Sequence, residues 1–200
     1  MATAQQRGVL PVSFFDRDAE EVARDLLGVV LESTHDGRTT LGRIVETEAY
    51  LGPHDAASHA AARIGRTKRN APMFGPPGTA YVYLIYGLHW CFNVVTGPVG
   101  YPAAVLIRAV EPISGLEVMR ERRGAGVADR DLARGPGRLA RAFRITGELN
   151  GHPLQEPPLR LLAGVPVAAD RVAVGPRIGV TGAVDWPLRF YLADSPWVSR

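Results

Sequence analysis

Three apolar runs between residues 79 and 112 constrain the fold more than any other feature of the sequence. The first, "TAYVYLIYG", is aromatic and β-branched almost throughout, which is typical of a strand. The second, "WCFNVVT", and the third, "AAVLIRAVEP", are separated by the turn "GPVGYP". Runs of this kind joined by short turns predict neighbouring strands. The centre of the chain is therefore expected to form an antiparallel sheet.

The chain before these runs is predicted to add a helix and a hairpin. Apolar residues at 19, 22, 23, 26 and 27 have helical spacing, with Asp16 or Asp18 as the N-cap and Gly28 as the end. The segments "VVLES" and "LGRIVETEAY" are predicted strands, joined by the Asp-Gly turn of "THDGRTT". Residues 54–77 are expected to be irregular and partly helical, ending in Pro-Pro-Gly.

The chain after these runs is predicted to contain two helices and short strands. "SGLEVMRERR" carries a capping box from Ser114 to Glu117, and "GPGRLARAFRI" reads as a helix opened by glycines. The tail alternates predicted strands ("PLRLLAG", "RIGVTG" and "LRFYLAD") with turns. Residues 1–200 contain no repeat or linker, so we expect a single α+β domain. Its curved, mainly antiparallel sheet would be surrounded by helices, with residues 1–12 as a candidate flexible N-terminal arm.

Composition excludes several classes of protein. With 200 residues and 46% hydrophobic content, the chain is long enough for one well-buried domain. It lacks a run of 18 apolar residues and the apolar core of a signal peptide, so neither a membrane span nor secretion is expected. Its one cysteine, Cys91, excludes an internal disulfide and a cysteine-rich zinc site. We therefore expect a cytoplasmic protein, associated with the nucleoid of a bacterium.

Basic residues gather in two stretches, although the net charge is only +3. "RIGRTKRN" holds four basic residues, and a second set of arginines runs from Arg120 to Arg144. Either stretch alone fits an ordinary solvated surface. Two such stretches around an aromatic segment favour a polyanionic partner.

The strand "RIVETEAY" presents two carboxylates on one face. Side chains alternate along a strand, so Glu46, Glu48 and Tyr50 share a face. Two carboxylates this close must be partnered or exposed. One of them could simply pair with an arginine, or it could act as a general base that activates water. Arg108, in the apolar run "AAVLIRAV", must also be paired, either in a structural ion pair or in holding a catalytic carboxylate or a phosphate.

Other candidates allow both a structural and a functional interpretation. Tyr86 precedes a glycine at a predicted turn, where an exposed aromatic ring can stack on bases or wedge between them. His54 and His59 could form a metal pair with Asp55 between them, but a hydrogen-bonding role for one histidine is favoured. Arg138, in "GPGR", could bind phosphate or lie in a plain helical turn.

Five motifs extend this pattern along the chain: "RIVETEAYLGP", "MFGPPGTAYVYLIYGLHWCFNVVT", "VLIRAVEP", "GPGRLARAF" and "SPWVS". In them the sequence resembles the alkyladenine (3-methyladenine) DNA glycosylase family, from about residue 20 to the C-terminus. The resemblance implies one mixed domain whose protruding β-hairpin enters the DNA minor groove. It also implies base flipping and cleavage of the N-glycosidic bond of damaged purines in double-stranded DNA, with no metal or other cofactor.

The same resemblance assigns roles to residues. Glu48 is expected to activate the attacking water with help from Arg108, while Glu46 becomes a structural partner. Tyr50 and Tyr83 are expected to sandwich the flipped base. The remaining expected roles are hydrogen bonding to the base and sugar region by His59, exclusion of normal purines by Asn93, insertion into the DNA by Tyr86, DNA-facing contacts by Met73 and Leu106, and phosphate binding by Arg63, Arg66, Arg69 and Arg138.

These roles predict a monofunctional enzyme that leaves an intact abasic site. Glycosylases that also nick the strand need an amine, and the single lysine, Lys68, is expected in a basic loop away from the pocket. We expect a monomer, and 3-methyladenine, 7-methylguanine, hypoxanthine and 1,N6-ethenoadenine all remain candidate lesions. Two alternatives are a non-catalytic nucleic-acid-binding module and a hydrolase of small nucleosides.

Overall fold

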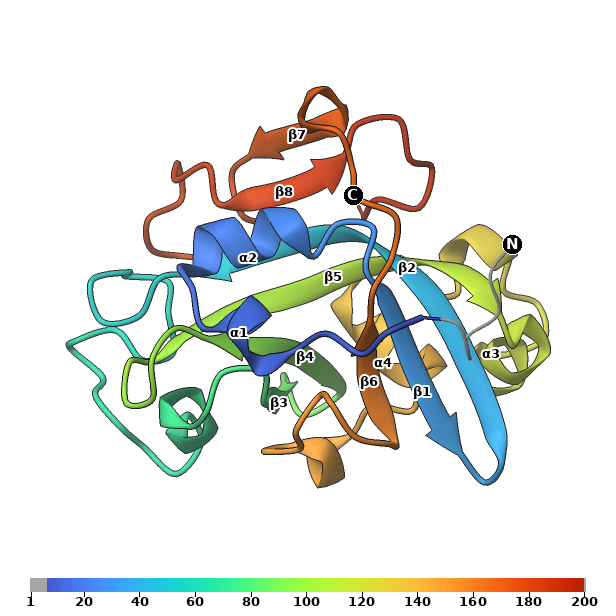
Figure 1. The fold of residues 1–200 in the computed structure, drawn as a ribbon, viewed down its shortest axis with the longest axis horizontal. Helices are drawn as coiled ribbons and strands as arrows, with labels where there is room; N and C mark the ends of the chain where they lie inside the picture. The colour runs from blue at the N-terminus through green and yellow to red at the C-terminus, as the bar shows by residue number, and fades with distance from the viewer. Residues whose placement is uncertain (1–6, 200) are drawn as a thin grey trace.

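One curled antiparallel sheet organises the molecule, as the ribbon in Figure 1 shows. In the computed structural model, which describes residues 7–199, its strands follow the order β3-β4-β5-β2-β1-β6, while β8 pairs with β2 and β7 with β8. With helices around this sheet, the predicted α+β class is confirmed. The strands are β1 (Val30–His35), β2 (Arg38–Tyr50), β3 (Ala80–Ile85), β4 (His89–Thr96), β5 (Ala103–Ser114), β6 (Leu159–Leu162), β7 (Val172–Gly175) and β8 (Arg189–Leu192).

The long strand β2 connects the parts of the sheet. It pairs with β1 through the predicted hairpin, whose Asp36 and Gly37 both have positive φ, as a tight hairpin turn requires. Further along, β2 pairs with β5 on one side and with β8 on the other. The register with β5 shifts between Ile44 and Thr47, a bulge of the kind that re-aims neighbouring side chains.

The register aligns side chains from four strands in one row. Glu48 on β2 lies opposite Leu106 on β5, which lies opposite Asn93 on β4. Asn93 in turn lies opposite Tyr81 on β3. Directly opposed residues of antiparallel strands point to the same face, so this row lines one face of the sheet. Their alternate neighbours point to the other face, where helices α2 and α4 complete the main apolar core.

The helices partly match the sequence predictions. The helix predicted before Gly28 is present as α2, and the Gly28 backbone has φ +89°. The capping box predicted at Ser114 is wrong, because β5 continues to Ser114 and α3 starts after Gly115 in a left-handed conformation. The helices are α1 (Val12–Phe15), α2 (Ala19–Asp25), α3 (Leu116–Arg123) and α4 (Pro136–Ala142), with short 3-10 helices η2 (Ala71–Phe74), η3 (Asp129–Asp131), η4 (Gly147–Leu149) and η5 (Ala169–Arg171).

The predicted tail strand at residues 177–182 is wrong, because this segment is a loop. Its Arg177 side chain and Ile178 amide bond to buried carboxylates instead of to a neighbouring strand. The sequence pattern also missed β7. Of the candidate arm, residues 1–6 lie outside the described part of the chain, while the Leu10 amide donates to the Leu161 carbonyl of β6 and Gly8 accepts from the Ala163 amide just after it.

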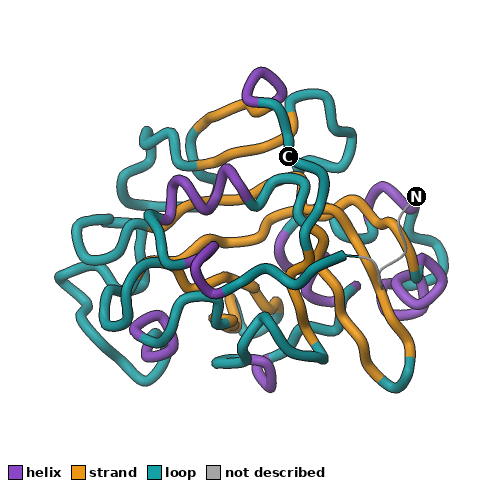
Figure 2. Tube along the Cα trace, viewed as in Figure 1, coloured by secondary structure: helices purple, strands orange, loops and turns teal. Residues whose placement is uncertain are grey.

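Long connections surround the sheet, and Figure 2 shows that the segment between β2 and β3 is almost entirely loop. The expected irregular excursion is therefore present, with η2 as its helical part. None of the helices between residues 7 and 199 has the length and apolarity that a membrane crossing requires.

Candidate active site

A cavity of about 260 Å³ lies on the sheet face that carries the row from Glu48 to Tyr81. Its walls include the four residues predicted to contact a base: Tyr50, His59, Tyr83 and Asn93. The loop after β2 and the loop of residues 179–181 complete the lining. Because pockets for drug-sized ligands begin at about 300 Å³, this cavity suits one flat ring system.

His59 contacts two tyrosine rings of the cavity, Tyr81 and Tyr83, edge to face. The His59 and Tyr83 ring centroids are 4.5 Å apart at an interplanar angle of 69°. The His59 Nδ1 atom lies 2.9 Å from the Tyr81 hydroxyl, and the Asn93 amide donates to the Tyr81 carbonyl at 3.1 Å. Tyr81 therefore fixes the orientation of the His59 and Asn93 side chains, both of which line the cavity.

Burial keeps the tyrosine and histidine side chains of the cavity in their uncharged forms. Burial raises the pKa of Tyr81 to about 12, and raises the pKa of Tyr50 and Tyr83 still further. Burial, together with the nearby Arg69 guanidinium, lowers the pKa of His59 below its ordinary 6.5. At neutral pH these four groups are neutral, so they offer aromatic faces and dipoles to an occupant, and the Arg63 guanidinium adds one cation to the lining.

Glu48 is fully buried beside this cavity and is held by three donors. Its Oε1 atom accepts from the Ile178 amide at 2.7 Å and pairs with Arg108 Nη1 at 3.1 Å. Its Oε2 atom accepts from the Tyr50 hydroxyl at 3.0 Å. Among residues 7–199 this is the only donor to Oε2, so that oxygen keeps capacity for another donor, such as a water molecule.

Glu46 is also buried, and it accepts four hydrogen bonds, three of them at one oxygen. Its Oε1 atom accepts from Arg108 Nε at 3.1 Å, from Arg189 Nε at 2.7 Å and from the Ser199 hydroxyl at 3.0 Å. Its Oε2 atom accepts from the Ser199 amide at 2.6 Å. Arg108 thus lies between the two carboxylates, and Glu46 anchors β8 and the segment after it to the site.

A buried ion pair that the sequence pattern does not reveal lies behind Tyr50. Arg177 and Asp55 form two hydrogen bonds of 2.6 and 2.8 Å, with both side chains fully buried. The Arg177 guanidinium also lies 4.8 Å from the Tyr50 ring centroid. Local sequence gives no signal for this contact, because Asp55 and Arg177 are 122 positions apart. It holds the loop that carries the Ile178 amide against the Tyr50 wall.

Tyr86 lies at the exposed tip of the β3–β4 hairpin, with 83% of its surface accessible. The turn has a hydrogen bond from the Leu88 amide to the Ile85 carbonyl, and Tyr86 and Gly87 both have positive φ. A bulky non-glycine residue rarely adopts this conformation, which carries an energetic cost. An exposed aromatic ring held at such a turn is a feature that folding alone does not require.

The other predicted DNA-contacting residues separate into exposed and buried groups. Arg63, Arg66 and Arg69 are exposed on the loop before β3, and Arg69 lies 5.1 Å from the Tyr83 ring centroid. Arg138 is half exposed and pairs with Asp131 at 3.1 Å. Met73 and Leu106 are 2% and 4% exposed, so neither side chain lies on the surface; Met73 lines the cavity and Leu106 lies in the row.

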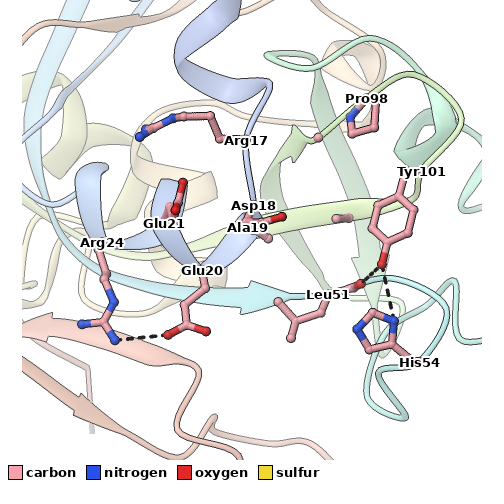
Figure 3. A pocket seen from close by; sticks show the side chains of 12 residues that line it. Arg17, Asp18, Ala19, Glu20, Glu21, Arg24, Leu51, His54, Pro98 and Tyr101 are labelled. Atoms are coloured by element: carbon pink, nitrogen blue, oxygen red, sulfur yellow. Dashed lines mark hydrogen bonds and ion pairs between the residues drawn. The ribbon is translucent and has the colours of Figure 1, made fainter.

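The two histidines of the loop after β2 lie in different places. Figure 3 shows His54 beside Tyr101 in a separate hollow near α2, where the Tyr101 hydroxyl lies 3.4 Å from His54 Nδ1. His59 lies in the cavity, and Asp55 is paired with Arg177. Within the described residues, no group of three or more His, Cys, Asp or Glu side chains is arranged to hold a metal ion.

The chain is similar along nearly its whole length to one family of proteins. The family model described as methylpurine-DNA glycosylase (MPG) matches residues 13–196. Identity is 47% over 193 residues with a protein of Carboxydothermus hydrogenoformans, covering 96% of this chain and 99% of that protein. It is 50% over 194 residues with a protein of Methanoculleus marisnigri (96% and 98% covered) and 51% over 189 residues with one of Rhizobium meliloti (94% and 95% covered). All three carry the name "Putative 3-methyladenine DNA glycosylase".

Proposed function

Because the chain belongs to the methylpurine-DNA glycosylase family, as its sequence motifs already indicated, we propose that it removes damaged purines from duplex DNA. The enzyme flips the damaged base into the cavity and hydrolyses its N-glycosidic bond with a water activated by Glu48. The product is an intact abasic site. The observation that carries this proposal is the buried Glu48 carboxylate, held by three donors beside a cavity of the size of one base.

In the proposed reaction Glu48 orients and deprotonates the attacking water. The water oxygen bonds to C1′ of the sugar, the bond from C1′ to the base nitrogen breaks, and the water proton passes to Glu48 Oε2. An alkylated purine that is cationic takes the bonding electron pair and leaves as a neutral base. Arg108, Tyr50 and the Ile178 amide fix the carboxylate, which supplies the positioning that such a step requires.

The neutral aromatic lining supports a role in holding the extruded base. Stacking of a base on an aromatic side chain contributes roughly 1–3 kcal/mol, which offsets part of the cost of flipping. We assign the stacking to Tyr50 and Tyr83, with a hydrogen bond to the base and sugar region from His59. Asn93 is held by its bond to the Tyr81 carbonyl, so a purine that bears an additional 2-amino group would meet a fixed side chain.

The exposed hairpin supports a role for Tyr86 in filling the space that the flipped base leaves. Beside it, Arg63, Arg66, Lys68 and Arg69 have no carboxylate within 4.0 Å among the described residues. Unpaired cations beside an exposed aromatic ring are suited to phosphates on either side of an inserted residue. Met73 and Leu106 would then support the cavity from below, and Arg138 would contribute a further phosphate contact.

Strand cleavage is not part of the proposed activity. A lyase step needs an amine close to C1′, and Lys68 is exposed on the loop before β3 rather than among the residues that line the cavity. We further propose that the enzyme acts as a monomer, in the cytoplasm and on the nucleoid.

The test uses duplex oligonucleotides that each carry 3-methyladenine, 7-methylguanine, hypoxanthine or 1,N6-ethenoadenine. Excision is read as strand breaks that appear only after alkali treatment. Glu48→Gln is expected to slow excision by about 10²–10⁴-fold while binding to lesion DNA is retained. Breaks without alkali would contradict the absence of a lyase step, and equal turnover of free nucleosides would favour a nucleoside hydrolase. Binding without excision of any lesion would favour a non-catalytic module.

A further inference from the structure

A second cavity, of about 640 Å³, lies between the β3–β4 hairpin and helices α3 and α4. It presents two apolar side chains of the hairpin and five arginines, which come from α3, from α4 and from the residues just after α4. We call this cavity the arginine groove; the residues that define it are Leu88, Trp90, Arg122, Arg123, Arg138, Arg141 and Arg144.

Three cations of the arginine groove have no anionic partner within residues 7–199. Arg122 donates to the Ala142 carbonyl at 3.0 Å, and Arg123 donates to the Leu132 carbonyl at 3.0 Å. Arg141 donates to the Arg122 carbonyl at 2.7 Å. Backbone carbonyls fix these side chains but leave their charges uncompensated.

Burial, and after it the charge of neighbouring arginines, lowers the pKa of two of these cations. Burial and the neighbouring Arg144 lower the pKa of Arg122, and burial with Arg138 and Arg141 lowers the pKa of Arg123. Both groups remain charged at neutral pH. A group of like charges that the fold does not neutralise is stabilised by a bound polyanion.

The arginine groove and the base-sized cavity lie on opposite faces of the same hairpin. Tyr83 lines the cavity, and the cross-strand pair of Leu84 and Trp90 comes next along the hairpin. Because side chains alternate between faces, Trp90 points away from the cavity and lines the groove. Tyr86 lies at the tip between the two.

If Tyr86 enters a duplex, the cavity and the arginine groove would lie on opposite sides of the inserted ring. A base flipped into the cavity would draw its own strand to the cavity side of Tyr86. The partner strand would then continue on the side of the arginine groove. Leu88, which is 76% exposed, is placed to contact that side of the stack.

We propose that the arginine groove binds phosphates of the strand complementary to the damaged one, an inference that rests on the proposed function. The groove positions the undamaged strand while the cavity holds the extruded base. Three uncompensated guanidinium groups recognise phosphate through charge and through paired N–H donors, without reading sequence.

The test compares a groove variant with a control of equal charge. Arg123→Gln/Arg141→Gln removes two groove cations. Arg7→Gln/Arg130→Gln removes two cations that also lack a carboxylate partner among the described residues but do not line the groove. Binding is measured against salt for one hypoxanthine oligonucleotide, as a duplex and as a single strand. Neutral methylphosphonates then replace phosphates in the complementary strand only.

The groove variant is expected to lose duplex affinity and to lower the slope of log K against log salt by about 0.9 per lost phosphate contact. Its affinity for the single strand should be unchanged. Methylphosphonates in the complementary strand should weaken its duplex binding less than they weaken that of the wild type. Equal loss on single strands would overturn the proposal in favour of the damaged strand. Unchanged duplex binding would exclude a DNA contact altogether.

Two further measurements distinguish a failure of the groove proposal from a loss of local packing and from a failure of the proposed glycosylase function. Arg123→Lys/Arg141→Lys keeps the charges and is expected to keep most of the salt slope, so a loss caused only by local packing would affect it as well. Excision at saturating enzyme reports the proposed function. If the wild type excises no lesion, that function fails, whereas the control variant Arg7→Gln/Arg130→Gln should excise at the wild-type saturating rate.

Discussion

The Arg177 guanidinium lies 4.8 Å from the Tyr50 ring centroid while forming a doubly hydrogen-bonded pair with Asp55. This contact joins the two sides of the candidate site. Tyr50 donates to Glu48 from β2, and the residue after Arg177 donates to Glu48 from the opposite loop. The orientation of Glu48, the proposed general base, thus depends on Arg177, a cation that does not contact the Glu48 carboxylate itself.

Arg177→Met is expected to weaken both stability and base binding. Removing one member of a buried ion pair leaves the other charge uncompensated, which costs about 3–5 kcal/mol of unfolding free energy. Loss of the cation behind Tyr50 should also raise the enzyme concentration needed for half-maximal single-turnover excision. Urea unfolding and single-turnover kinetics provide the two measurements.

The double variant Asp55→Asn/Arg177→Met separates these two effects. With both charges removed, most of the lost stability should return, because no buried charge remains unpaired. Weak base binding should persist, since Tyr50 still lacks its cation. Recovery of wild-type base binding together with stability would show that Arg177 has no positioning role.

Glu46→Gln is expected to destabilise the protein more than Glu48→Gln does. Glu46 compensates Arg189 as well as Arg108, and it also accepts two hydrogen bonds from Ser199. Glu48 has one arginine partner, and that arginine keeps Glu46 when Glu48 is changed. We expect a loss of about 3–5 kcal/mol for Glu46→Gln, measured by denaturant unfolding. A larger loss for Glu48→Gln would contradict the anchoring role given to Glu46.

Local patterns predicted the elements that form this site but not how they meet. Alternation along β2 correctly placed Glu46, Glu48 and Tyr50 on one face, and the apolar runs correctly gave β3, β4 and β5. Strand register decides that Glu48, Leu106 and Asn93 form one row, and a bulge that periodicity does not reveal contributes to that register.

Long-range partners account for what the sequence did not reveal. The predicted strand at residues 177–182 failed because its polar groups bond to Asp55 and Glu48, and these tertiary contacts override local β propensity. The two loop histidines are five positions apart, yet only the folded loop shows that one meets Tyr81 and the other Tyr101. Site roles came from the family resemblance and remain predictions.

Asn93→Ser is expected to relax discrimination against purines that carry a 2-amino group. The asparagine amide is fixed on the Tyr81 carbonyl, so it cannot move aside for a larger base edge. Excision of 7-methylguanine relative to hypoxanthine, measured under single-turnover conditions, should therefore rise in the variant. An unchanged ratio would mean that Asn93 does not screen this edge of the base.

The titration of His59 predicts how acid affects stability. The pKa of His59 is below 6.5 in the folded protein, chiefly because the ring is buried, whereas the unfolded chain takes up its proton near 6.5. Above about pH 6.5 both states are neutral and the group contributes no pH dependence. As the pH falls below that value, the unfolded state binds the proton first, so stability declines until the folded pKa is passed.

The difference in unfolding free energy between wild type and His59→Gln isolates this effect, since other groups are common to both. Both proteins are measured by urea unfolding from about pH 7.5 to about pH 5.5. As the pH falls, the wild type should lose unfolding free energy relative to His59→Gln. A constant difference over this range would show that His59 titrates normally in the folded protein.

Substitutions of Tyr86 are expected to affect excision from duplex DNA without lowering the stability of the fold. Its positive φ is unfavourable for a bulky side chain, and its ring is 83% exposed, so folding gains little from it. Tyr86→Gly and Tyr86→Asn both suit this backbone, and each is expected to leave stability unchanged or raise it by up to about 1 kcal/mol. Both should slow excision from duplex DNA, because the space left by the flipped base is no longer filled.

The effect of these variants should depend on the DNA. Excision from a single strand, which has no paired stack to fill, should change much less than excision from a duplex. Leu84→Ala, which truncates another exposed side chain of the same hairpin that lines neither the cavity nor the arginine groove, is the matched control for a general disturbance of the hairpin. If both Tyr86 variants excise from duplex DNA as fast as the wild type, the strained turn does not serve insertion. Loss of stability in Tyr86→Gly would instead place the role of the ring in the fold.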